Sequence, residues 1–312
     1  MRCATKSDID HKVEKYQNQN KELSDLLKLH GEIMKVLIEH RDRLINENKT
    51  KYEKELIFNK DKLKSLAEKN SYLLNDYELN IDPRHFFDIY NQVVRVVKEL
   101  DHRLEDNLSY FKDSVLKNID TIIKLLQDER YSSDFKSTRN KLFKLLEVNS
   151  YFNENDDESD FDPNILSFLL FYSLVPFYTS FTACLPADVD TSGWTKGNCP
   201  ICYSKPIISK LRAEDGARIL HCWLCSFEWE YPRLQCPYCE NNEFNKLGYY
   251  YADEDSSRRA SVCSECTKYI KTISLGDIVG DINSELENIF TLPLDYLAQR
   301  KGYMPGGGMP LG

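Results

Sequence analysis

Eight of the ten cysteines in this 312-residue chain form four Cys-x-x-Cys pairs, separated by gaps of 19, 10 and 23 residues. Two thiolates three positions apart on a tight turn can bind one metal ion from the same side, and a second pair completes the tetrahedron. Four pairs therefore predict two metal sites. Pairing in chain order needs the shortest chain excursions and gives these ligand sets: Cys199, Cys202, Cys222 and Cys225 for the first site, and Cys236, Cys239, Cys263 and Cys266 for the second.

The ions that fit these sites are zinc and iron, because four thiolates in tetrahedral geometry suit both. Cys-Pro-x-Cys, present at 199–202 and 236–239, is typical of rubredoxin and zinc-ribbon knuckles. Those knuckles commonly place glycine after the second cysteine, where φ is positive. In this chain the corresponding residues are Tyr203, Ser226, Glu240 and Thr267. We expect two metal ions per chain, iron or zinc, and we expect Cys3 and Cys184 to be bystanders.

Other uses of the cysteines are less favoured. Cys-Pro-Tyr-Cys at 236–239 also matches a glutaredoxin-type dithiol, but that motif requires a following helix, and here a polar turn and a strand follow. A closed four-thiolate site has no open position for a substrate, which argues against metal-dependent hydrolysis. His221, beside Cys222, is expected to be a strand residue or to support a ligand. No P-loop, GxGxxG, HExxH or GxSxG motif is present, so we predict no catalytic residues and no enzyme activity.

The charge of the chain argues against a general nucleic-acid-binding protein. The net charge is −9, and residues 196–271 hold 11 Lys and Arg against 10 Asp and Glu, so no basic surface is indicated. The run Tyr249-Tyr250-Tyr251 could stack on bases, but packing within a strand is favoured without a basic groove. The polar N-terminus lacks the apolar segment of a secretory signal, which predicts a cytoplasmic protein with reduced thiols.

The residues before the cysteine pairs have the periodicity of helices. Helices are expected over these ranges: 8–48, 60–74, 83–100, 106–127 and 135–146. The first range could form a coiled coil, although His30 and Arg41 interrupt its apolar seam and favour a helix of a bundle. Gly31 is a candidate break in this helix. Asp82-Pro83 has the pattern of an N-cap followed by the first helical residue.

Residues 165–187 carry no charge and have nearly the length of a membrane span. Pro176 and several hydroxyl side chains interrupt this apolar stretch, and acidic residues flank both of its ends. Because no Lys or Arg bias sets an orientation, we expect a buried helix and no membrane span.

The cysteine-rich region has strand patterns. Phe227, Trp229 and Tyr231 alternate with glutamates, which predicts a strand with one apolar face. Residues 247–251 and 269–274 are two further strand candidates. The predicted fold class is α+β, with a helical domain at 1–190, two rubredoxin-like or zinc-ribbon modules at 191–275, and a C-terminal helix from Gly276 with a flexible tail at the end of 276–312.

The residues between the cysteines resemble those of the FdhE family of formate dehydrogenase accessory proteins. The order of all four pairs matches, and the similarity also includes these residues: Gly216-Ala217-Arg218, Glu228-Trp229, Arg233, Gly248-Tyr249, Tyr269 and Lys271. The similarity is strong over about residues 163–275, with Pro176-Phe177 in the helix that leads into the metal region. It is faint in the N-terminal helices.

This resemblance implies a helical N-terminal part joined to two rubredoxin-like modules. It also implies a cytoplasmic, non-enzymatic protein that binds the catalytic subunit of a molybdenum- or tungsten-dependent formate dehydrogenase and is required for its maturation. The alternatives that stay open are a rubredoxin-like iron electron carrier and a zinc-ribbon nucleic-acid binder. The oligomeric state and the docking surface are not indicated by the sequence.

Overall fold

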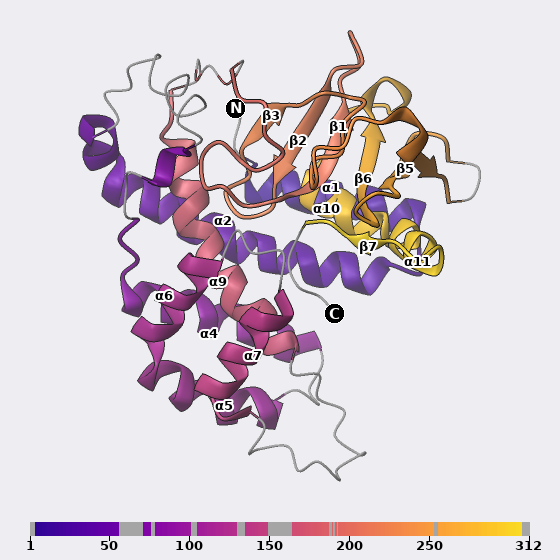
Figure 1. Cartoon of the computed structure of the whole chain (residues 1–312). Coiled ribbons are helices and arrows are strands. Elements are labelled where there is room, and N and C mark those ends of the chain that lie inside the picture. Colours follow the sequence, from indigo (N-terminus) through magenta and orange to yellow (C-terminus); the bar gives the residue numbers. More distant parts are fainter. Residues whose placement is uncertain are drawn as a thin grey trace.

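The computed structural model describes residues 4–55, 71–75, 79–100, 105–129, 135–148, 164–186, 189, 191, 193–252 and 255–307. In this part of the chain a group of helices lies beside a mixed sheet, and two yellow helices near the C-terminus pack on the sheet (Figure 1). The predicted α+β class is confirmed. The predicted domain boundaries stay a prediction.

The helical part contains most of the predicted helices. Their bounds are α1 Lys6–Gln19, α2 Ser24–Glu55, α4 Pro83–Leu100, α5 Glu105–Lys117, α6 Ile119–Glu129, α7 Phe135–Leu145 and α9 Asn164–Ala183. Asp82 caps α4 as predicted, because its carboxylate accepts the backbone N–H of Arg84 at 2.8 Å. The predicted helix at 60–74 lies mostly outside the described residues, and within them Leu73–Asn75 forms the short 3₁₀ helix η1. Cys3 also lies outside the described residues.

The first predicted helix, 8–48, is two helices in the structure. The break falls before Ser24, where the side chain of Asn20 accepts the backbone N–H groups of Glu22 and Leu23, and not at Gly31. A Cβ atom on Gly31 would lie 2.6 Å from Val13 Cγ2. The glycine therefore allows α1 and α2 to approach each other closely. Similarly, the predicted helix 106–127 is divided into α5 and α6 at Asn118, whose amide donates to the carbonyl of Ser114 at 2.9 Å.

Helix α9 is the apolar helix that the sequence predicted to be buried. Residues 165–183 are long and apolar enough to cross a membrane, but 78% of the tested window is buried within the structure. Four of its hydroxyl groups, those of Ser173, Thr179, Ser180 and Thr182, donate to carbonyls of the same helix. Ser173 donates to Leu169 at 2.8 Å and Thr179 to Val175 at 2.8 Å. These bonds satisfy most of the hydroxyl groups that dilute the apolar stretch, the buried Ser167 hydroxyl being an exception, so α9 can occupy the centre of the core.

The cysteine-rich part forms one continuous sheet from the described residues. Its strands are β1 Pro206–Leu211, β2 Arg218–Cys222, β3 Glu228–Glu230, β4 Leu247–Tyr250, β5 Arg258–Cys263, β6 Lys268–Ser274 and β7 Met304–Pro305. The order is β3-β2-β1-β6-β5-β4, with β7 beside β6. Strands β1 and β6 pair in parallel, which joins the strands of the two predicted modules into one sheet.

The C-terminal residues differ from the prediction of one helix beginning at Gly276. The structure has a 3₁₀ turn at Leu275–Asp277, followed by α10 Ser284–Phe290 and α11 Leu292–Arg300. Helix α10 starts at Ser284 because the Asn283 side chain accepts the N–H of Leu286 at 2.9 Å. Met304 and Pro305, which the sequence placed in a flexible tail, form β7.

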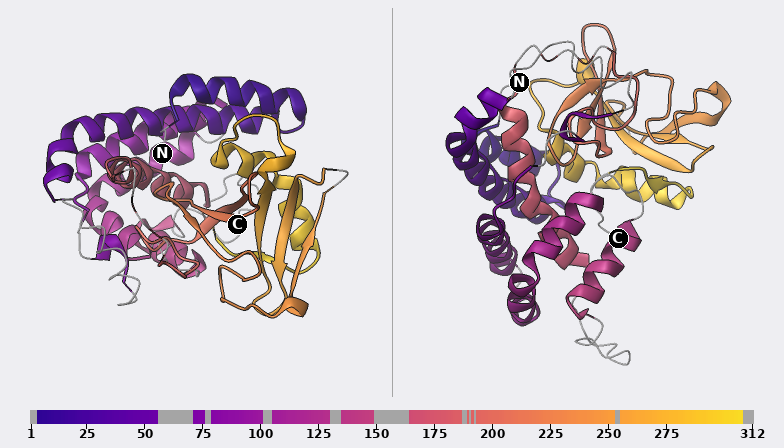
Figure 2. Two further views of the ribbon diagram at one scale, coloured as in Figure 1. Left: turned by 90° about the horizontal axis from the view of Figure 1, so that it is seen from above. Right: turned by 60° about the vertical axis from the view of Figure 1, so that its left-hand side comes forward.

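Helix α10 connects the sheet to the helical part. The views in Figure 2 show this yellow helix between the indigo N-terminal helices and the sheet. Leu286 and Ile289 of α10 share an apolar cluster with Ile9 and Tyr16 of α1 and with Leu27 of α2. The first two helices of the chain are therefore held against the last third of the sequence.

Candidate metal centres

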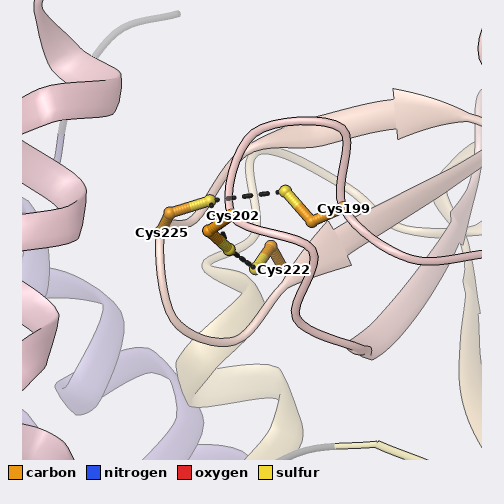
Figure 3. Close-up of side chains that lie close together, drawn as sticks. All are labelled: Cys199, Cys202, Cys222 and Cys225. Carbon is orange, nitrogen blue, oxygen red and sulfur yellow. Dashed lines mark hydrogen bonds between the residues drawn. The ribbon is translucent and has the colours of Figure 1, made fainter. Parts of the chain in front are cut away.

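The first cluster brings together the four thiols predicted for the first site (Figure 3). Cys199 and Cys202 lie on the loop before β1, whereas Cys222 ends β2 and Cys225 lies in the turn that follows. The Cys202 sulfur is 3.5 Å from both the Cys222 and Cys225 sulfurs. The Cys199 and Cys225 sulfurs are also 3.5 Å apart. The four side chains are 0–1% exposed, so this cluster is closed to solvent.

The second cluster brings together the other four predicted thiols. Cys236 and Cys239 lie on the loop between β3 and β4, Cys263 ends β5, and Cys266 lies in the turn before β6. Sulfur–sulfur distances are 3.7 Å for Cys236–Cys266 and 3.8 Å for Cys239–Cys263. Cys239 is exposed and Cys266 is partly exposed. The second cluster therefore meets solvent, unlike the first.

The sulfur spacing fits a tetrahedral ion in both clusters. Zinc–thiolate bonds of ~2.3 Å place the sulfurs of a tetrahedral site about 3.8 Å apart. The observed separations of 3.5–3.8 Å lie close to that value. Each cluster could thus hold one metal ion. Because both have the same four-sulfur donor set, their geometry does not separate iron from zinc, and the ligand role of each cysteine stays a prediction.

The turn after each Cys-x-x-Cys pair has a left-handed backbone conformation, which glycine adopts most easily. The residue following the second cysteine has a positive φ in all four turns: 65° at Tyr203, 54° at Ser226, 61° at Glu240 and 56° at Thr267. The N–H of Glu240 still donates to the Cys236 carbonyl at 2.9 Å, which closes the turn. A left-handed conformation costs a non-glycine residue roughly 1–2 kcal/mol. The missing glycines therefore leave the turn geometry unchanged and cost stability.

Replacing Glu240 with glycine should stabilise the protein by about 1 kcal/mol, because glycine adopts a positive φ without the steric cost. The metal-loaded protein should unfold at a higher temperature in a thermal melt. The matched control is Glu243→Gly, an exposed glutamate nearby whose φ is −70°. This control should lower the midpoint or leave it unchanged. Equal shifts in the two variants would show that Glu240 carries no backbone strain.

Tyr203 packs the first cluster against the helical part. Its ring stacks on Tyr72 with the ring centroids 4.9 Å apart. Next to it, the backbone N–H groups of Leu73 and Leu74 donate to the carbonyls of Pro200 and Ile201 at 3.0 and 2.9 Å. A glycine at position 203 would lose the stacking contact, which gives a physical reason for tyrosine in this turn.

Burial of the first cluster opposes ionisation of its thiols. Removal from water raises the pKa of Cys199 and of Cys225 well above the ordinary thiol value. Only a bound cation would stabilise four thiolates at this depth. The donor set and the burial together fit a metal ion that is held for structure.

His221 lies beside the first cluster in β2, as the sequence predicted. Its Nδ1 and Nε2 atoms lie 3.0 Å from carboxylate oxygens of Glu228 and Glu285. Burial lowers the pKa of His221, but the two carboxylates have the larger combined effect and raise its pKa from the ordinary value to about 9. Since both ring nitrogens contact carboxylates, His221 connects β2 to β3 and α10 and has no free ring nitrogen for a metal ion.

Arg218 is a supporting residue of the second cluster that the metal analysis of the sequence did not identify. It is buried in β2, its Nε donates to Ser209 Oγ at 2.9 Å, and its Nη1 donates to the carbonyl of Gln235 at 2.9 Å. Gln235 precedes Cys236, so Arg218 fixes the turn that carries this thiol. Its positive charge also lies near Cys236 and would offset the negative charge of a four-thiolate site. The only sequence signal was its place in the Gly216-Ala217-Arg218 run.

A large cleft lies between the helical part and the cysteine-rich part. Its volume is about 2080 Å³. Leu29 and Ile33 of α2 and Phe168 of α9 contribute to an apolar wall, and Trp223 and Phe227 line it beside the first cluster. The volume exceeds the roughly 300–1,000 Å³ of ordinary small-molecule pockets.

Comparisons with known proteins agree with this architecture. The family described as "FdhE, central domain" matches residues 198–233, which include the first cluster. An FdhE homologue of Aquifex aeolicus is 34% identical over 163 residues, which cover 51% of this chain and 55% of that protein. An FdhE homologue of Actinobacillus pleuropneumoniae serotype 3 is 31% identical over 144 residues, covering 45% and 46% of the two chains.

These alignments span about half the length of the curated relatives. A solved structure extends the likeness in fold to the whole chain. The FdhE protein from Pseudomonas aeruginosa superposes with a TM-score of 0.57 at 17% identity, covering 100% of this chain and 99% of that one. The helical part and the cysteine-rich part therefore occur together in a known fold.

Proposed function

We propose that this chain, which is similar to FdhE proteins in its cysteine-rich part and in its fold, is a member of that family and an accessory protein in the maturation of formate dehydrogenase. It acts in the cytoplasm, binds the catalytic subunit of that enzyme before assembly, and has no catalytic activity of its own. The eight clustered cysteines hold two metal ions, and these ions stabilise the shape of the cysteine-rich part.

The observation that best supports a binding role is the position of the first cluster. A four-thiolate site has no open position for a substrate, and this one is 0–1% exposed. Its knuckle nevertheless lines the large cleft through Trp223, Cys225 and Phe227. An ion at this place would fix one wall of the cleft without entering a reaction.

We place the catalytic subunit's contact in this cleft, because its volume is suited to a protein segment and its walls come from both parts of the chain. The helical wall is apolar at Leu29, Ile33 and Phe168. The opposite wall carries charged side chains, among them Lys210 and Glu285. A segment with one apolar and one polar side would match both walls.

The experiment is co-purification of the formate dehydrogenase catalytic subunit with two variants of matched chemistry. Leu26→Arg places a charge at the cleft, on an exposed leucine of α2 that is 38% exposed. Leu116→Arg makes the same change on α5, at a leucine that is 51% exposed and outside the cleft lining. The first variant should capture at least about tenfold less subunit, equivalent to ~1.4 kcal/mol, and the second as much as wild type.

The results separate the site from the function. If neither variant affects capture, the contact lies elsewhere on the molecule. If wild-type protein captures no catalytic subunit under anaerobic conditions, the proposed function itself is wrong. Elemental analysis with a visible spectrum on the same preparation tests the electron-carrier alternative, which requires iron with a redox-dependent spectrum and is excluded by two zinc ions.

A further inference from the structure

The two thiol clusters differ in their access to solvent. All four cysteines of the first cluster are 0–1% exposed. In the second cluster Cys236 and Cys263 are buried, Cys266 is partly exposed, and Cys239 is exposed. Cys239 is therefore the thiol of the eight that a dissolved reagent meets first.

The exposed thiol has a close partner. The Cys239 sulfur lies 3.8 Å from the sulfur of Cys263, which is buried and receives a weak hydrogen bond from the amide of Asn241 at 3.9 Å. A disulfide needs a sulfur–sulfur distance of about 2.05 Å, so small movements of the two side chains would join them. An exposed thiol beside a second thiol is the arrangement of a reactive and a resolving cysteine.

We propose that Cys239 is an oxidation site for small hydroperoxides, with Cys263 as its resolving partner. The Cys239 thiolate attacks the O–O bond of hydrogen peroxide, which gives a sulfenic acid and hydroxide. The Cys263 thiolate then attacks the sulfenic sulfur, forming the disulfide and releasing a second hydroxide. Two thiolates lose two electrons in total, and one peroxide gains them.

The reaction removes two of the four sulfur ligands of the second site. The remaining pair, Cys236 and Cys266, cannot hold the ion in a tetrahedral shell, so the second site loses its metal. The first site keeps its metal because Trp223 and Leu224, which are 5% and 0% exposed, lie in its knuckle and the cluster is part of the main core. The inference does not depend on the proposed role in formate dehydrogenase maturation.

The test uses the full-length protein loaded with two zinc ions and treated with hydrogen peroxide. Native mass spectrometry should show the two-zinc form converting to a one-zinc form as the second site loses its ion. The ion of the first site should be released at least about tenfold more slowly. Peptide mapping of the one-zinc form should find the disulfide between Cys239 and Cys263. A reductant with added zinc should restore the two-zinc form.

An independent measurement uses iodoacetamide on the zinc-loaded protein carrying Cys184→Ser, which removes a partly exposed thiol outside both clusters. Among the eight clustered cysteines, Cys239 should be alkylated first. The proposal is overturned if both zinc ions leave at the same rate, if the first disulfide joins cysteines of the first cluster, or if the first label falls on another cysteine of the eight.

Discussion

Replacing Cys202 with serine should remove one of two metal ions and destabilise the helical part as well as the first knuckle. The Cys202 sulfur lies 3.5 Å from those of Cys222 and Cys225 and is fully buried. Its cluster belongs to the same apolar core as Phe171 of α9. Binding of a structural zinc ion contributes roughly 10–16 kcal/mol in small zinc domains. This range is comparable with the whole unfolding free energy of a typical protein, about 5–15 kcal/mol. We therefore expect the helical part to unfold at a markedly lower temperature.

The measurement combines metal content with circular dichroism. The Cys202→Ser protein should contain at most one ion per chain and lose helical signal at a lower temperature. The matched control is Cys239→Ser in the second cluster, where the side chain is exposed. That variant should also lose one ion but retain the helical signal. Retention of two ions in either variant would contradict the assignment of these cysteines as ligands.

The parts of the structure that could be predicted depend on local patterns. The cap at Asp82 and the burial of α9 could be predicted because each depends on residues that are neighbours in the sequence. The grouping of the thiols in chain order also followed from short connections, because hairpin-length segments bring successive Cys-x-x-Cys pairs together. The absence of glycine after each pair was a poor guide, since Glu240 and its equivalents adopt the positive φ themselves.

The parts that were missed depend on contacts between distant residues. Strands β1, β2 and β5 lack a clear alternation, and the parallel pairing of Ile208 with Lys271 joins segments that no short-range pattern connects. Gly31 was interpreted as a break because the sequence does not show that Val13 packs against it. The cleft is equally invisible, because its walls come from both ends of the chain.

A buried contact between α1 and α10 is centred on Glu287, and its loss should cost about 3–5 kcal/mol of unfolding free energy. Glu287 of α10 is 0% exposed. It accepts hydrogen bonds from Arg258 Nε and Nη2 at 2.8 and 2.9 Å, and from the Tyr16 hydroxyl at 2.6 Å. In Glu287→Leu, Arg258 would stay largely buried without this partner, and the Tyr16 hydroxyl would lose its acceptor.

Urea unfolding of the metal-loaded protein measures this cost. The control is Glu47→Leu, which removes the exposed ion pair with Arg43 within α2, where both side chains are about half exposed; a surface pair contributes ~0–1 kcal/mol. The double variant Arg258→Met with Glu287→Leu should recover part of the stability, because it removes the largely buried guanidinium that the single variant leaves with only the partly exposed Asp255 as an ion-pair partner. If the double variant is no more stable than Glu287→Leu, the network acts mainly through the Tyr16 hydroxyl. Its contribution would then lie in holding α1 on α10, and removal of that hydroxyl by Tyr16→Phe should reproduce most of the loss.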